Sequence, residues 1–224
     1  MAVRISVVIP ALDEESNLAA AIASVRADAE VIVVDGGSRD GTIAAALAAG
    51  ARVLLGPRGR GRQLGAGAAA ARGGWLVFLH ADTRLESGWA AALLALGEGV
   101  AGGAFGFAVD SPRRAFRWIE TGVRLRCALL RLPYGDQAVF ARRAAYERAG
   151  GFAPLPLMED VDLVRRLRRV GALAFPPVRA VTSARRWEER GLVGTTLLNW
   201  TLLGMYALGW PPERLAKLYG GRAA

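Results

Sequence analysis

Residues 4–35 read RISVVIPALDEESNLAAAIASVRADAEVIVVD, and this stretch decides the fold of the 224-residue chain. Two β-branched runs, residues 4–9 and 30–34, predict buried strands. Between them Leu18, Ile22 and Val25 recur at helical spacing, which predicts a helix over residues 13–26. A strand, a helix and a second strand in this order indicate parallel strands joined by a covering helix.

The same alternation continues outward along the chain. A helix over 40–50, a strand over 52–55, a loop over 57–67 that runs into a helix over 64–72, and a strand over 75–79 are expected in that order. The second half is less regular, with expected strands over 102–109 and 137–140 and helices over 113–130 and 158–170. The predicted fold class is α/β, with a mainly parallel central sheet flanked by helices.

The composition of the chain limits the classes of ligand and the cellular compartment that can be expected. With 53% hydrophobic residues the chain has ample material for one core, and its net charge of +9 favours nucleotide diphosphates, anionic membranes or nucleic acid. Cys127 is the only cysteine, which excludes an intramolecular disulfide and a cysteine-based metal cluster. The first ten residues are too short for the apolar part of a signal peptide, so a cytoplasmic location is expected.

Acidic residues follow three of the predicted strands. Asp13, Asp35 and Asp82 come after the first, second and fourth strands, and the carboxyl ends of parallel strands meet in one crevice. No GxxxxGK[ST] loop and no GxGxxG turn follows the first strand, so another group must bind phosphate. A divalent cation held by Asp82 could bridge two phosphates.

Four segments then resemble the family 2 glycosyltransferases with the GT-A fold. VVIPALDEE, VIVVDGGSRDGT, FLHADT and LMEDVDL occur in that family's order and spacing, and the resemblance extends over residues 3–187. GDQAVFARR at 135–143, with Gly150, Gly151 and Phe152, is further similar to a subgroup of small bacterial proteins labelled as radical-SAM or selenodomain-associated transferases.

The resemblance implies a role for each matching residue. Pro10, Ala11 and Glu14 would line the nucleobase pocket, and Asp35 would contact the base or ribose. Asp82 would hold Mg²⁺ or Mn²⁺ at the metal-binding end of the DxD motif. Asp160 would be the catalytic base of the ED motif. The residues expected on the nucleotide-sugar side are Pro10, Ala11, Glu14, Asp35, Arg62, His80, Ala81 and Asp82.

The chain departs from the family pattern at three places. His80 occupies the first DxD position, where it either joins Asp82 as a metal ligand or hydrogen-bonds the ribose or diphosphate. Gly65 replaces the usual asparagine, which leaves Arg62 as the expected donor-side cation. Residues 183–187 (SARRW) keep an Arg-Trp pair without the glutamine of processive relatives, so polymer synthesis is not expected.

A second group of residues is expected on the acceptor or diphosphate side. Glu159 would hold Asp160 in place, and Asp136 and Gln137 would either contact the acceptor or pin a loop. Trp187 would either stack on sugar or fill a gap in the core. The full group is Asp136, Gln137, Glu159, Arg185, Arg186 and Trp187.

These residues predict inverting, metal-dependent transfer of a sugar from a nucleotide diphosphate sugar to the hydroxyl of an unknown acceptor. UDP is slightly favoured over GDP, and no nucleic-acid partner is expected. A nucleotidyltransferase is one alternative, although it would need a glycine-rich basic loop where residues 10–14 read PALDE. A non-catalytic basic binding module on the same fold is the other.

The C-terminal segment is predicted to be separate from the main domain. Residues 1–190 would form the GT-A domain and 191–224 a helical extension. Residues 192–210 contain no charge, yet they include several threonines and glycines and are short for a membrane span. The extension is expected to pack on the domain, pair in a homodimer, or make peripheral contact with the inner face of a membrane.

Overall fold

The two β-branched runs lie side by side at the heart of the sheet. In the computed structural model, which describes residues 4–131 and 133–220, β1 (Ile5–Ala11) pairs in parallel with β2 (Glu30–Asp35), with Val7 opposite Val31. The parallel pairing of these strands is confirmed, and both are buried almost throughout. Burial on both faces is typical of parallel strands covered by helices.

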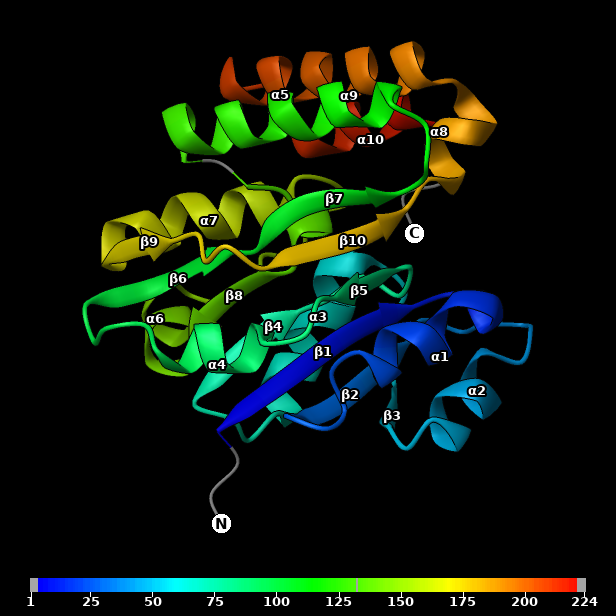
Figure 1. Ribbon diagram of the computed structural model, residues 1–224, viewed down its shortest axis with the longest axis vertical. Helices are drawn as coiled ribbons and strands as arrows, with labels where there is room; N and C mark the ends of the chain where they lie inside the picture. Colours follow the sequence, from blue (N-terminus) through cyan, green and yellow to red (C-terminus); the bar gives the residue numbers. More distant parts are fainter. Residues whose placement is uncertain (1–3, 132, 221–224) are drawn as a thin grey trace.

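Seven strands form the central sheet, shown in Figure 1, in the order β3-β2-β1-β4-β8-β6-β9. All neighbours are parallel except β8, which is antiparallel to both β4 and β6. The remaining five strands are β3 (Arg52–Leu55), β4 (Trp75–Phe78), β6 (Val100–Ala104), β8 (Val139–Arg142) and β9 (Ala172–Ala174). The sheet is therefore mixed and mainly parallel, as predicted.

Helices cover both faces of this sheet. Val7 and Ile9 of β1 point into a core shared with α1 (Glu15–Ala23), α2 (Thr42–Ala48) and α4 (Trp89–Leu94). Val8 points into the opposite core, shared with α3 (Arg60–Ala70), α6 (Arg143–Arg148) and α7 (Glu159–Val170). Alternate side chains of a strand point to opposite faces, so the side chains of β1 pack against both helical layers.

A second, three-stranded sheet has the order β5-β10-β7. It consists of β5 (Thr83–Leu85), β10 (Arg179–Ser183) and β7 (Gly106–Asp110), and it leads into α8 (Arg185–Arg190). The long helix α5 (Ala115–Leu130) packs on it where Phe107 meets Phe116 and Trp187. A short 3₁₀ helix, η1 (Gly135–Gln137), precedes β8.

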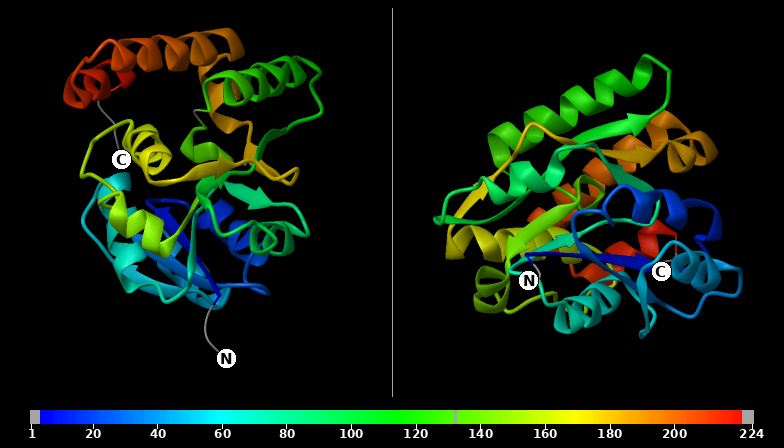
Figure 2. Two further views of the ribbon diagram at one scale, coloured as in Figure 1. Left: turned by 90° about the vertical axis from the view of Figure 1, so that its left-hand side faces the viewer. Right: turned by 60° about the horizontal axis from the view of Figure 1, so that its bottom comes forward.

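The C-terminal segment forms two helices, α9 (Leu192–Ala207) and α10 (Pro212–Tyr219). Leu202 and Leu215 pack with Val161 of α7, and Figures 1 and 2 show the pair at the same end of the molecule as α5. No helix among the described residues is long and apolar enough to cross a membrane. The division of the chain at residue 190 stays a prediction, and 221–224 lie outside the described residues.

Two predicted boundaries in the chain were wrong. The helix expected from Leu64 begins at Arg60, one turn earlier, directly after Gly59, whose positive φ of 122° suits glycine. The single strand expected over 102–109 is two strands, β6 and β7, which belong to different sheets and are separated by the buried Phe105.

Two helical glycines allow a matched test of this packing. A Cβ on Gly67 of α3 would lie 2.2 Å from Cγ1 of Val8, whereas a Cβ on Gly122 of α5 would meet nothing within 4 Å. We expect Gly67→Ala to lower the free energy of unfolding by about 1–3 kcal/mol through overpacking. Gly122→Ala should raise it by up to about 1 kcal/mol through helix propensity. Urea denaturation of both variants measures this, and equal effects would contradict the close contact of α3 with β1.

Candidate active site

Two adjoining pockets lie where the central sheet meets α3, α7 and α8, and both are lined by Arg60, His80 and Arg186. The first, here the strand-end pocket, is also lined by Pro10, Ala11, Leu12, Glu14, Gln63, Ala81 and Asp82. The second, here the acidic pocket, is also lined by Tyr134, Gly135, Asp136, Leu157, Met158, Asp160, Val161, Asn199, Leu202 and Tyr219. Residues from distant parts of the sequence thus converge on one site.

Gln63, a buried residue that lines the strand-end pocket, ties α3 to the ends of β1 and β2. Its Nε2 donates hydrogen bonds to the carbonyl oxygens of Ala11 (2.9 Å) and Val34 (2.8 Å), which lie at the ends of β1 and β2. Glu14 is held from two sides, by Nδ2 of Asn17 and by Nη2 of Arg185. The pocket is therefore built before any ligand arrives.

Asp35 does not line either pocket. Its side chain is buried, and Oδ2 accepts hydrogen bonds from the backbone N–H groups of Gly37 (2.9 Å) and Ser38 (3.0 Å). Oδ1 accepts a further bond from the hydroxyl of Ser38. The carboxylate thus holds the turn after β2, which is the structural role that aspartate commonly has at such turns.

Arg60 lines both pockets, whereas Arg62, the predicted donor-side cation, lines neither of them. Because α3 begins at Arg60, Arg60 and Gln63 are one turn apart and share the face that meets the pockets. Arg62 is exposed and lines a separate pocket with Arg58 and Glu213. Because the helix was predicted to begin too late, the prediction selected Arg62, which lies outside the two pockets, in place of Arg60.

An ion pair joins the first residue of α3 to the first residue of α7 beside the two pockets. Nε of Arg60 donates to Oε1 of Glu159, whose side chain is only 1% exposed. The charge of Glu159 raises the pKa of Arg60, so the guanidinium stays charged despite its burial. Glu159 begins α7, and the pair holds the next residue, Asp160, at the edge of the acidic pocket.

Asp160 faces His80 across the backbone of Gly135. The N–H of Gly135 donates to Oδ2 of Asp160 (2.5 Å). A Cβ on Gly135 would lie 2.7 Å from Nε2 of His80 and 3.0 Å from Oδ2 of Asp160, so only glycine leaves both side chains in place. Burial and the positive charges of Arg60 and Arg186 hold the pKa of His80 well below its usual range, and its imidazole is neutral.

Asp136 carries an unsatisfied oxygen in the acidic pocket. Its Oδ1 atom is buried and has no hydrogen-bond partner among the described residues. Burial raises the pKa of Asp136 to about 6, with the charge of Asp160 in the same direction and that of Arg126 opposing it. This oxygen is therefore free to accept a hydrogen bond from a donor that enters the pocket.

For Gln137 and Trp187 the structure favours the structural one of the two predicted alternatives. Gln137 is 2% exposed, donates through Nε2 to the carbonyl of Phe105, and accepts from Arg126 through Oε1, so it pins the loop. Trp187 packs edge-on against Phe107 and Phe116, and fills the core. Neither lines the two pockets, whereas Arg186 lines both.

Five polar side chains that line the pockets were missed by the sequence prediction: Arg60, Gln63, Tyr134, Asn199 and Tyr219. An earlier helix start would have placed Gln63 beside Arg60. Asn199 and Tyr219 come from the C-terminal helices, and no local pattern indicates that these helices fold back onto the site. Tyr219 accepts a hydrogen bond from Nη1 of Arg186 at 3.0 Å, which ties α10 to α8.

The residues at the junction suit a metal ion shared with a diphosphate. Among the described residues, no group of three or more His, Cys, Asp and Glu side chains could enclose an ion by itself. Mg²⁺ is usually held by one or two carboxylates together with substrate phosphates, and a neutral imidazole is a common ligand of transition metals. Asp82 and the neutral His80 supply this partial set.

A sheet of this order, with acids at its strand ends and arginines at a divided pocket, defines a nucleotide-dependent transferase. Residues 6–145, more than half of the chain, match the family model for glycosyl transferase family 2. The chain belongs to this family, and the predicted GT-A arrangement is confirmed. Asp160 and Arg186 lie beyond the matched residues.

Curated relatives are similar over part of the chain. An uncharacterised glycosyltransferase of Mycobacterium tuberculosis is 36% identical over 85 residues, which cover 38% of this chain and 39% of the relative. Glucosyl-3-phosphoglycerate synthase of Mycolicibacterium paratuberculosis is 41% identical over 92 residues, which cover 35% of this chain and 28% of the relative. The aligned part is thus well under two thirds of these relatives.

Solved structures show the same arrangement over most of the chain. Glucosyl-3-phosphoglycerate synthase of M. tuberculosis with Mn²⁺, UDP and glucosyl-3-phosphoglycerate has a TM-score of 0.57 and 27% identity, covering 81% of this chain and 70% of that one. The complex of that enzyme with Mn²⁺, UDP-glucose and phosphoglyceric acid has a TM-score of 0.55 and 26% identity, covering 77% and 69%. These relatives bind a metal ion with a uridine nucleotide.

The raised pKa of Asp136 predicts a pH-dependent stability. The pKa is about 6 in the folded chain and about 3.9 when unfolded, so the folded state binds the proton more tightly. Stability therefore falls as the pH rises from about 4 to 6 and stays lower above that. Asp136→Asn should raise the free energy of unfolding by about 2–3 kcal/mol at about pH 7.5 and leave it nearly unchanged at about pH 4. Denaturation at both pH values tests this, and a gain of equal size at both would show that the cause is not ionisation.

Proposed function

We propose that this protein transfers a sugar from a UDP-sugar to the hydroxyl of an acceptor, with inversion at the anomeric carbon and Asp160 as the base. The observation that carries the proposal is the shared wall of the two pockets. Arg60, His80 and Arg186 line the strand-end pocket, which suits a nucleotide, and also the acidic pocket, which holds Asp160. A donor and an acceptor could therefore meet at that wall.

Asp160 is suited to remove the acceptor proton. One oxygen of its carboxylate is held by the N–H of Gly135, and the carboxylate borders the acidic pocket. The acceptor O–H bond breaks and its proton passes to Asp160, while the oxygen forms a bond to the anomeric carbon. The bond from that carbon to the diphosphate breaks, and the electron pair leaves with UDP.

The departing diphosphate gains negative charge, which nearby cations offset. Arg186 is exposed at the shared wall, and its Nη1 donates only to the hydroxyl of Tyr219 among the hydrogen bonds of the described residues. Arg60 adds positive potential but is neutralised by Glu159, so Arg186 is the better partner for the diphosphate. A divalent ion, Mg²⁺ or Mn²⁺, would be held by Asp82 and His80 and would act as a Lewis acid on the phosphates.

UDP is preferred to GDP because the structurally similar synthase binds UDP and UDP-glucose. That synthase also binds phosphoglyceric acid, but the acceptor of this protein is proposed only as a hydroxyl compound. The similarity of GDQAVFARR to the radical-SAM or selenodomain-associated subgroup remains part of the proposal. A nucleotidyltransferase is disfavoured, because the segment that ends β1 carries Glu14 in place of the glycine-rich basic loop expected there.

Loss of Asp82 should uncouple metal binding from nucleotide binding. Because the described side chains do not supply a complete set of metal ligands, we expect Mn²⁺ to bind weakly by itself and tightly only together with UDP. Asp82→Ala should weaken Mn²⁺-dependent UDP binding by roughly 10–100-fold, a range found even for groups that only support metal ligands. Calorimetric titration with UDP, with and without Mn²⁺, measures the effect. Asp28→Ala, at an exposed aspartate outside both pockets, is the control, and equal affinity in all three proteins would remove Asp82 from the metal site.

Loss of Asp160 should abolish transfer and spare donor binding. Asp160→Asn keeps the shape of the side chain but removes the base, so kcat should fall about 10²–10⁴-fold while the affinity for UDP with Mn²⁺ is retained. Asp162→Asn is the matched control, since Asp162 lies in the same helical turn but pairs with Arg166.

Release of UDP from UDP-[¹³C]glucose in a panel of hydroxyl acceptors measures both variants, and NMR of the product gives the anomeric configuration. A product that retains the donor configuration would refute the inverting step. Release of pyrophosphate from UTP would instead establish the nucleotidyltransferase alternative.

A further inference from the structure

The outer side of α9 exposes a continuous apolar stripe. Val193, Leu197, Trp200 and Leu208 are 75%, 65%, 46% and 83% exposed, and they recur at helical spacing along a segment without any charged residue. The opposite side of the helix is already used, because Leu202 and Leu203 pack against α7 and α10. The helix is thus apolar on both sides, with one side uncovered.

α5 extends this surface. Trp118, Leu125 and Leu129 are 82%, 59% and 72% exposed, and they form one stripe along the helix. Figure 1 and the left view of Figure 2 place α5 and α9 together at the top of the molecule, away from the central sheet. The α5–α9 face is here defined as Trp118, Leu125, Leu129, Val193, Leu197, Trp200 and Leu208. Exposed apolar side chains gathered in this way mark an interaction site.

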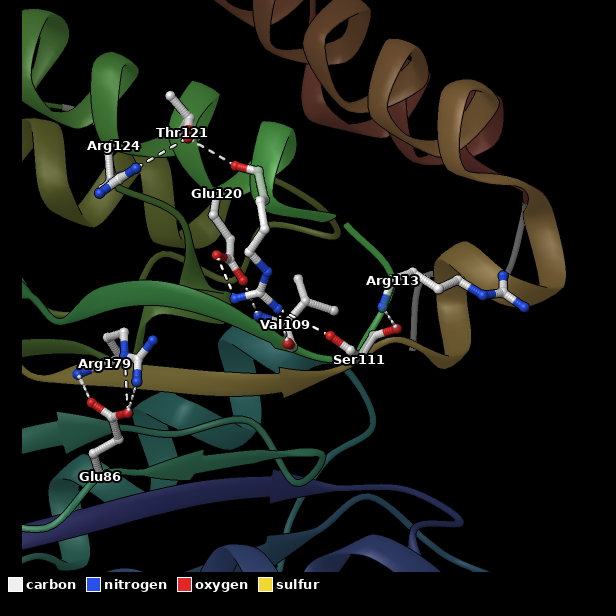
Figure 3. Close-up of polar contacts among 9 residues, drawn as sticks. Glu86, Val109, Ser111, Arg113, Glu120, Thr121, Arg124 and Arg179 are labelled. Atoms are coloured by element: carbon white, nitrogen blue, oxygen red, sulfur yellow. Dashed lines mark hydrogen bonds and ion pairs between the residues drawn. The ribbon is translucent and has the colours of Figure 1, made fainter. Parts of the chain in front are cut away.

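Exposed arginines lie on the α5 side of the α5–α9 face. Arg113, Arg114 and Arg124 are exposed at α5 and its N-terminal end. Glu120, the only acid in α5, is buried. It accepts hydrogen bonds from the N–H of Val109 in β7 and from the guanidinium of Arg117, as Figure 3 shows. Figure 3 also shows the side chain of Arg113 extending away from β7.

We propose that the α5–α9 face docks on the surface of an anionic lipid bilayer. Its apolar side chains would enter the boundary between headgroups and acyl chains, and its arginines would meet the lipid phosphates. Trp118 and Trp200 suit this depth, where tryptophan is enriched. A second copy of the chain fits less well, because a two-fold contact through this face would bring the same arginines together.

Docking in this orientation would also bring the acidic pocket near the bilayer. A groove between α5 and α9 is lined by Ile119, Val123, Thr196 and Trp200, and its floor includes Asp136, which also lines the acidic pocket. An acceptor hydroxyl carried by a membrane-anchored amphiphile could reach Asp160 along this groove. This part of the inference rests on the proposed function.

Flotation of the full chain with vesicles tests the docking. We expect binding to vesicles of phosphatidylcholine with phosphatidylglycerol at about 0.15 M salt, and little binding to phosphatidylcholine alone. Leu197→Ser/Leu208→Ser should weaken binding on the order of tenfold. Leu47→Ser/Leu55→Ser removes two leucines that are 58% and 80% exposed in α2 and β3, and it should bind like the wild type.

The arginines provide a second, charge-matched comparison. Arg113→Gln/Arg114→Gln should weaken binding by about fivefold for each arginine. Arg39→Gln/Arg148→Gln changes the net charge equally at exposed sites outside the face, and it should have a much smaller effect. Circular dichroism melts establish that each variant is folded.

Three results would overturn the docking proposal. The first is an absence of flotation with anionic vesicles, and the second is an equal loss of vesicle binding in the two arginine pairs. The third is a change from dimer to monomer in analytical ultracentrifugation of Leu197→Ser/Leu208→Ser while its vesicle binding is unaltered. Flotation requires no nucleotide sugar, so it separates the two proposals. A chain that floats but transfers no sugar would refute only the proposed function.

Discussion

The ion pair between Arg60 and Glu159 connects the first residues of two helices that lie 99 positions apart in the sequence. Glu159 is buried, so loss of Arg60 would leave its carboxylate without a compensating charge, which is strongly destabilising. The helices approach closely at Gly61, where a Cβ would lie 2.9 Å from the carbonyl of Ala153 and 3.2 Å from Cβ of Glu159. The strand-end pocket and Asp160 are thereby fixed relative to each other.

The first half of the fold could be predicted because its signals are local. β1, β2 and β4 are short apolar runs buried on both faces, and α1 has its apolar residues at helical spacing. The second half depends on pairing between distant segments. β6 is glycine-rich because Gly102 and Gly103 lie against Phe140 and Ala174, and the strands β5 and β9 have only three residues each, too few to show a period.

The site was predictable where a strand end fixes the residue. Asp82 lines the strand-end pocket near the end of β4, and Pro10 and Ala11, which the family resemblance assigned to the nucleobase side, line it at the end of β1. Residues on helices were harder to predict. The helix α3 begins one turn earlier than expected, and Arg60 lines the pocket while Arg62 does not. Gln137 and Trp187 have side chains that could either bind or pack, and only the tertiary structure shows that they pack.

The C-terminal helices give the acidic pocket its outer wall. Asn199, Leu202 and Tyr219 line it, and the bond from Arg186 to Tyr219 fastens that wall to the rest of the site. The stretch shared with the family ends at residue 145, well before these helices begin. Under the proposed function, the acceptor side is thus shaped by residues that the family model does not cover. A change of acceptor would then call for substitutions in α9 and α10, while the strands that line the nucleotide side could stay as they are.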